Sequence, residues 1–151
     1  MAWVSRSGVA ILITLIILVI QLNQNTIATQ SANRQAASTR MEYLLMEEAK
    51  SDELVNIVSK VISGQEITSI EQARYAIYLA AWARLTEETY LQYLEDQISE
   101  GYWLSRANNM VHGRLQTPIS REYIRRWMNN GYMASEFSIW LEDELNREYG
   151  E

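Results

Sequence analysis

The sequence contains no cysteine, one proline and six glycines among its 151 residues. Without cysteine there can be no disulfide framework, no thiolate zinc site and no thiol nucleophile. The scarcity of proline and glycine leaves long stretches in which nothing in the backbone chemistry interrupts a helix. Runs of alternating apolar and polar residues bounded by turns, which would indicate β-strands, are also missing. The chain is therefore predicted to be all-α.

Acidic residues are missing from the first 40 positions, whose only charged side chains are three arginines. All 19 Asp and Glu residues follow, with the other 10 of the 13 Lys and Arg, so the rest of the chain has a net charge of −9. Such an acidic body lacks the basic surface with which proteins release counterions from nucleic acid. We therefore expect no nucleic-acid partner.

One long hydrophobic run is present at residues 9–22, VAILITLIILVIQL, and only Thr14 and Gln21 break it. Fourteen helical residues span about 21 Å, which is less than the roughly 30 Å of a bilayer core. Counted from Trp3, the segment reaches about the full thickness, with Trp3 at one interface and Arg6 extending toward the headgroups. Its length and composition are typical of a membrane-spanning helix.

Three interpretations of this segment compete. A secretory signal peptide would need a small-residue cleavage site, and the following TIATQSA is a poor candidate. A buried core helix would need apolar partners on all sides, and no later segment supplies enough of them. We favour an uncleaved anchor at residues 1–23, with the lipid bilayer as its partner. Because Arg6 lies near one end and Arg34 and Arg40 lie far beyond the other, the positive-inside rule favours a cytoplasmic N-terminus.

The helix is predicted to continue beyond the membrane as a stalk at residues 24–50, because no glycine or proline occurs between Val9 and Ser63. Polar side chains would meet the headgroups at its exit: Gln21, Gln24, Asn25 and Thr26. Beyond them Ala28, Ala32 and Ala36 recur every four residues, a stripe that permits close approach of another helix. The stalk is either a polar spacer or a packing face for the head, a membrane-protein partner or a second copy of the chain.

Residues 51–151 are predicted to form an acidic head, a small helical bundle. Its central helix should contain residues 75–83, YAIYLAAWA, which is apolar all round but too short to cross a bilayer. The expected helix starts are Ser51, the capping box Thr68-x-x-Glu71, Ser99, Thr117-Pro118 and Ser135. The expected ends are Gly64, a break near His112-Gly113, and Asn129-Asn130-Gly131.

Few side chains of the head suggest chemistry. The single histidine, without a Glu-x-x-His pair or a glycine-rich phosphate loop, predicts no metal and no cofactor. Glu87 follows the apolar stretch and could be the buried general acid or base of a membrane-tethered enzyme. A carboxylate in this position is more often a satisfied structural group, and we expect that role here. The arginines at positions 114, 121, 125 and 126 could bind an acidic partner or lipid headgroups, but we expect them to pair with Glu142, Asp143 and Glu144.

In these residues the sequence resembles a widespread, uncharacterised family of small bacterial proteins with one N-terminal membrane helix. Its members leave the membrane through a Q-x-x-Q-N-T-x-A-T pattern, which residues 21–29 match. They also contain a central E-N-x-Y-x-Q motif, matched by Glu87, Tyr90 and Gln92, while Glu88 stands in place of the asparagine. A tryptophan near Trp127 and a Ser-x-Phe segment near Phe137 complete the likeness.

The resemblance implies a fold, a topology and a bacterial inner-membrane location, but no activity. With the orientation rule it places the head in the periplasm, and a cytoplasmic head stays open. Together these observations favour a non-enzymatic interaction module, either an accessory subunit of a membrane complex or a self-associating anchor.

Overall fold

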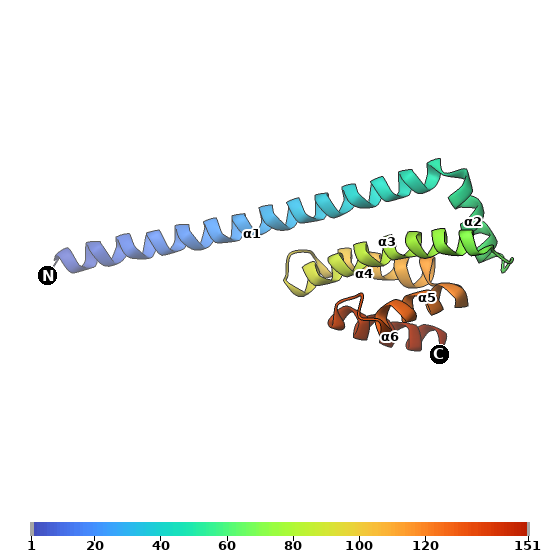
Figure 1. Ribbon diagram of the computed structural model, residues 1–151. Helices are drawn as coiled ribbons and strands as arrows, with labels where there is room; N and C mark the ends of the chain where they lie inside the picture. The colour runs from blue at the N-terminus through green and yellow to red at the C-terminus, as the bar shows by residue number, and fades with distance from the viewer. Residues whose placement is uncertain (1, 151) are drawn as a thin grey trace.

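The computed structural model describes the backbone of residues 2–150 and the side chains of residues 8–150. The side chains of Trp3 and Arg6, on which the expected membrane boundary and orientation rest, lie outside the described residues. No strand occurs between residues 2 and 150, which confirms the all-α prediction. The elements are α1 (Ala2–Lys50), α2 (Asp52–Ile62), α3 (Ser69–Leu94), α4 (Glu100–Asn108), the π-helix η1 (Asn109–Arg114), α5 (Pro118–Asn129) and α6 (Ser135–Tyr149) (Figure 1).

Helix α1 joins the hydrophobic run and the stalk without interruption. Its 49 residues correspond to a length of about 73 Å, and its N-terminal part extends well beyond the other helices (Figure 1). Side chains from residue 8 to residue 29 are exposed on every side. From Gln30 onward one face of the helix is covered by the head. The expected long N-terminal apolar helix followed by a small helical bundle is therefore confirmed.

Helix α3 lies at the centre of the head and contacts α1, α2, α4, η1, α5 and α6. Figure 1 shows it between α1 on one side and α5 and α6 on the other. The predicted apolar stretch supplies its core, with Tyr75, Leu79 and Trp82 almost fully buried. Ile77, in the same stretch, is 71% exposed. The stretch is therefore the centre of the head, as predicted, although the face of Ile77 is not buried.

The second half of α1 packs against α3 through a mixed apolar and polar contact. Ala37 and Met41 are 6% and 5% exposed. Near the turn after α3, the Nδ2 of Asn33 donates to the Oε1 of Gln97 at 2.8 Å. The Nε2 of Gln30 donates to the backbone carbonyl of Asp96 at 2.6 Å. The turn after α3 is thereby tied to the stalk about 12 Å, or eight residues, beyond Leu22.

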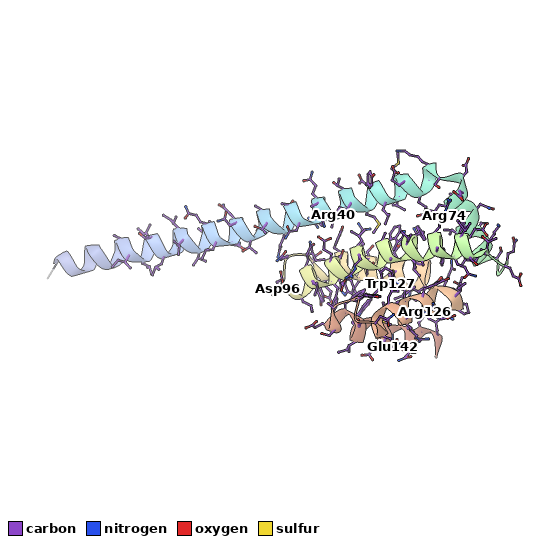
Figure 2. All side chains as sticks on the ribbon, viewed as in Figure 1. Arg40, Arg74, Asp96, Arg126, Trp127 and Glu142 are labelled. Carbon is purple, nitrogen blue, oxygen red and sulfur yellow. The ribbon has the colours of Figure 1, made fainter. Side chains whose placement is uncertain are left out.

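An ion pair connects the middle of the same contact. The guanidinium of Arg40 on α1 pairs with the carboxylate of Glu88 on α3. Figure 2 shows Arg40 beneath α1, facing α3, and Asp96 at the end of the head nearer to the N-terminus. Glu88 is the residue that replaces asparagine in the suspected family motif, so in this chain the position holds a stalk-binding carboxylate.

The alanine stripe does not take part in this contact. Ala28, Ala32 and Ala36 are all exposed. At about 100° per residue, Ala28 and Ala32 lie roughly 180° and 140° around the helix from the buried Ala37. The prediction that the head, if it folded back, would approach this stripe is therefore wrong. The face stays available to another protein.

Most of the predicted helix ends are confirmed, because their signals are local. The hydroxyl of Ser51 accepts from the N–H of Leu54 at 3.2 Å, and Thr68 and Glu71 form the expected capping box. The Nζ of Lys60 also donates to Glu71 at 2.6 Å, and this contact, with the hydrogen bonds from Thr68, lowers the pKa of Glu71 to about 2. The cap of α3 therefore holds a charged carboxylate next to the positive end of the helix dipole.

Two boundaries differ in detail from the prediction. The break expected near His112-Gly113 lies at Arg114, because α4 passes directly into η1, a wider π-helical turn that ends there. Ser135 does not cap α6. The residue before the helix is Ala134, and its backbone N–H donates to the carboxylate of Glu87 on α3. A side chain distant in sequence thus replaces the local cap.

We expect Ala37→Leu and Ala36→Leu to have different effects on stability, because the two alanines lie on different faces of the stalk. A leucine at the buried position 37 overpacks the contact with α3, which typically costs about 1–3 kcal/mol. A leucine at the exposed position 36 leaves that contact intact, and the helix propensities of the two substitutions are alike. Thermal unfolding followed by circular dichroism in detergent should show a lower melting temperature for Ala37→Leu only. Equal melting temperatures would mean that the head does not pack on this face.

Candidate functional site

A cleft opens where the end of α1 diverges from α3 and α2 bridges the two. Its volume is about 340 Å³, within the range of sites that take small ligands or partner side chains. Most of its wall is apolar, formed by Leu44, Leu54, Ile57, Ile77 and Ala81. An ion pair between Glu53 of α2 and Arg74 of α3 lies at its edge, and Figure 2 shows Arg74 near this end of α3. We call this space the first cleft.

Polar groups converge at one wall of the first cleft. The hydroxyl of Tyr78 donates to the Oε1 of Glu48 at 2.9 Å, and the Nη1 of Arg114 donates to the same oxygen at 3.1 Å. Arg114 also donates to the Tyr78 hydroxyl. Its guanidinium carbon stands 3.9 Å from the centre of the Trp82 ring, in cation–π geometry. Three elements that are distant in the sequence, α1, α3 and η1, are joined in this cluster.

Burial keeps the Tyr78 hydroxyl of this cluster protonated. It raises the pKa of Tyr78 well above its usual value; Arg114 opposes the shift, and the Glu48 carboxylate adds to it. The hydroxyl therefore stays protonated and serves as a hydrogen-bond donor to Glu48. The other carboxylate oxygen of Glu48, Oε2, is buried and has no hydrogen-bond partner. A buried acceptor without a donor is costly, so this oxygen weakens the cluster.

The π-helix explains how Arg114 reaches this position. A π-turn inserts extra length into a helix and rotates the residues that follow it, and such turns are frequent at functional sites. Met110 and Val111 of η1 are buried in the core. Arg114 at its end then has a side chain that is only 17% exposed.

A second cleft adjoins the first on the outer face of α3. Its volume is about 530 Å³, and it is lined by Ile77, Ala80, Ala81, Arg84, Trp127 and Tyr132. The rings of Trp127 and Tyr132 meet edge to face, with centroids 5.9 Å apart. Ile77 and Ala81 line both clefts. The two clefts therefore form one apolar surface, interrupted by the exposed Ile77 side chain.

Glu87, the candidate general acid, has structural contacts. It is 6% exposed, and its carboxylate accepts from the backbone N–H of Ala134 and from the Nη1 of Arg84 at 2.7 Å. The carboxylate thus stabilises the start of α6, where a negative charge is favourable. Glu87 lines neither cleft. These contacts favour the structural role over acid–base chemistry.

The other residues of the suspected central motif lie apart from the clefts. The ring of Tyr90 packs among Trp103, Phe137 and Trp140, at centroid distances of 5.0, 5.7 and 5.6 Å. Burial raises the pKa of its hydroxyl. Gln92 is half-buried, and its Oε1 has no hydrogen-bond partner. Of the four predicted polar positions in the head, only Trp127 lines a cleft.

The predicted juxtamembrane residues all lie on the free part of α1. Gln21, Gln24, Asn25 and Thr26 are exposed, and the Thr26 hydroxyl donates to the backbone carbonyl of Leu22 at 3.0 Å. The structure therefore keeps them apart from the head, as it does the alanine stripe.

The arginines of the basic segment have separate partners. Arg125 reaches the predicted acidic tail, with its Nε 3.2 Å from Glu142. Arg114 pairs with Glu48 of α1 instead, and Arg126 pairs with Glu122 in its own helix. Arg121 donates to the backbone carbonyls of Leu115 and Gln116. Figure 2 shows Arg126 and Glu142 in the lower half of the head, away from α1. The four arginines therefore have different partners.

Sequence reasoning missed Glu48, placed Tyr78 only in the apolar centre of the head, and expected Arg114 to pair with the acidic tail rather than with Glu48. A weak signal exists for the first, because Ala37, Met41, Leu44 and Glu48 follow a heptad-like 4-3-4 spacing along one face of α1. No local pattern joins it to Arg114, which lies 66 residues away. Among the described residues, no group of three or more His, Asp or Glu side chains is arranged to hold a metal ion.

No family model, no curated protein and no solved structure matches the chain. The resemblance to bacterial single-pass proteins therefore stays a prediction.

We expect Glu87→Ala to lower the free energy of unfolding by about 2–3 kcal/mol, because it removes hydrogen bonds to a charged acceptor and leaves the N–H of Ala134 unpaired. Glu87→Gln keeps a carbonyl acceptor for that N–H and should cost about 1 kcal/mol. Urea unfolding in detergent, followed by tryptophan fluorescence, measures both. If Glu87→Gln were as damaging as Glu87→Ala, the charge itself would be required rather than the hydrogen bond to Ala134.

Proposed function

We propose that this chain is a single-pass membrane protein of the bacterial inner membrane that acts as a non-enzymatic interaction module. The observation that supports the anchor is the exposure of the hydrophobic run. Between Ile11 and Leu22 the large aliphatic side chains are 49–64% exposed on all sides of α1. This helix is long and apolar enough to cross a bilayer. Inserting its eleven Ile, Leu and Val residues into lipid is favourable by about 3–6 kcal/mol on a biological insertion scale.

The interaction role rests on the two-sided use of the stalk. The head covers the face of Ala37 and Met41, whereas the alanine stripe and the amides before it stay exposed. Small residues at a helix surface allow a second helix to approach closely, and amides at the membrane interface can hydrogen-bond across the pair. We propose that Ala28, Ala32 and Ala36 contact a membrane-protein partner or a second copy of the chain. The orientation rule places the head on the periplasmic side.

The anchor is tested by membrane extraction. Full-length protein expressed in a bacterium should stay in the membrane pellet after a carbonate wash and dissolve in non-ionic detergent, because its apolar helix is held by lipid. The measurement is an immunoblot of both fractions with mass determination of the product. Recovery in the soluble fraction, or a product that starts near Ser31, would overturn the proposal.

The interaction face is tested by Ala32→Leu. We expect this variant to lose a detergent-stable complex, because the larger side chain prevents close helix approach, while the melting temperature of the head stays that of the wild type. Size-exclusion chromatography with light scattering measures the complex. The control is Arg34→Leu, which changes the stalk away from the stripe. If the wild type and both variants formed indistinguishable complexes, the stripe would not be an interaction face and the stalk would be only a spacer.

A further inference from the structure

We propose that the contact between the stalk and the head is a latch with a hinge at Ser51, which opens when α1 rotates away from α3 while the head stays folded. The proposal does not depend on what the alanine stripe binds. Ser51 is the only residue between α1 and α2, and Figure 1 shows α2 leaving the end of α1 at a steep angle. A residue at a helix end can absorb the backbone rotation of a hinge.

Helix α2 belongs to the head side of this hinge. Its Ile57 is fully buried in the core. Two ion pairs also join α2 to the first turns of α3, Glu53 with Arg74 and Lys60 with Glu71. A rotation at Ser51 would therefore move α1 against a head that keeps α2.

The stalk contributes little apolar surface to the latch. Between Gln30 and Lys50 only Ala37 and Met41 are buried. Polar side chains supply the hydrogen bonds and ion pairs to the head: Gln30, Asn33, Ser38, Arg40 and Glu48. The core that joins α3 to α5 and α6 consists by contrast of fully buried apolar side chains, among them Leu79, Ile124, Phe137 and Leu141. Because water can replace polar contacts at little net cost, the stalk is the more weakly held side of α3.

Buried polar atoms without partners weaken the latch further. Among the described side chains, the Oε2 of Glu48, the Nε of Arg114 and the Oε1 of Gln92 are buried and have no hydrogen-bond partner. Gln92 follows Glu88, the ion-pair partner of Arg40, by one helical turn and therefore lies on the stalk side of α3. Opening the latch lets these atoms bind water, which lowers the cost of the open state.

The latch is also incompletely packed near the hinge. The first cleft, about 340 Å³ between α1, α2 and α3, lies beside Ser51, so apolar side chains there lack contacts on one side. Farther along the stalk, the pair of Arg40 and Glu88 is 55% and 43% exposed. Ion pairs with such exposure contribute little stability. Local opening of a weakly packed element, with the core intact, is the expected behaviour of such a contact.

The two states differ in where the head lies. In the closed state Gln30 holds the turn after α3 about 12 Å beyond Leu22 along the stalk. In the open state the head is joined to the anchor only through Ser51, about 43 Å beyond Leu22. The latch therefore switches the head between a position beside the stalk and a free position at its tip. Opening also uncovers the face of α3 that carries Glu88 and Gln92.

Paired spin labels measure the two states, because the chain has no cysteine of its own. Gln35→Cys with Ser105→Cys reports the distance between the stalk and the head, and Ser105→Cys with Asn146→Cys reports a distance within the head. All three positions are exposed. Double electron–electron resonance is recorded on the full-length protein in non-ionic detergent. We expect two distances for the first pair, the longer one from the open state, and one distance for the second pair.

Variants of the latch should shift the ratio of the two stalk–head distances. Arg40→Glu replaces an ion pair by a repulsion and should raise the open fraction relative to the closed one at least about threefold. Adding Glu88→Arg restores a pair and should reverse this change. Gln92→Leu removes a buried acceptor without a partner and should favour the closed state. Arg126→Glu is the matched control, since it breaks an exposed ion pair within α5, and it should leave the ratio unchanged.

Three results would overturn the proposal. The first is a single stalk–head distance in the wild type. The second is a distance within the head that changes together with the stalk–head distance, because the head would then unfold rather than separate from the stalk. The third is an effect of Arg126→Glu as large as that of Arg40→Glu.

Discussion

The structure depends on the burial of α3 between the stalk and the rest of the head. Every other described helix contacts it, and its aromatic residues supply much of the core. Without α3, α1 would keep its contact with α2 but lose its packing on the centre of the head, and the start of α6 would lose the carboxylate of Glu87. Because isolated helices gain little stability in water, packing on α3 is what makes the remaining helices persist.

The fold class and most helix starts could be predicted because their causes are local. An N-cap, a capping box or a proline at the first helical position acts within three residues, so the sequence displays it directly. The failures have the opposite origin. The N–H of Ala134 is satisfied from 47 residues away, and the π-helix at Asn109–Arg114 contains the buried Met110 and Val111. Tertiary packing overrides local preference in each case.

The two clefts could not be predicted for the same reason. Of the residues that line them, sequence reasoning proposed only Trp127 as a site residue, and for its likeness to a family motif rather than for its position. Ser51 was expected only as a helix start, and Ile77, Tyr78, Ala80 and Ala81 only as core. Glu48, Tyr78 and Arg114 converge through three elements, and their separations of 30 and 66 residues obey no short motif. Conversely, the residues chosen for their order along the chain, Glu87, Tyr90 and Gln92, do not line the clefts. Glu87 and Tyr90 share the face of α3 that meets α6 and its start, where their contacts are structural.

The continuity of α1 has a geometric consequence. Between the apolar run and the first head contact at Gln30 the chain stays helical, so the direction in which the head points is coupled to the number of stalk residues. Each inserted residue would lift the head by about 1.5 Å and also turn it by about 100°. The distance of the head from the apolar run can therefore change without a change in the direction of the head only in steps of about seven residues. Such a step restores the original direction to within about 20°. The number of stalk residues thus sets both the distance of the head from the apolar run and the direction in which the clefts of the head face.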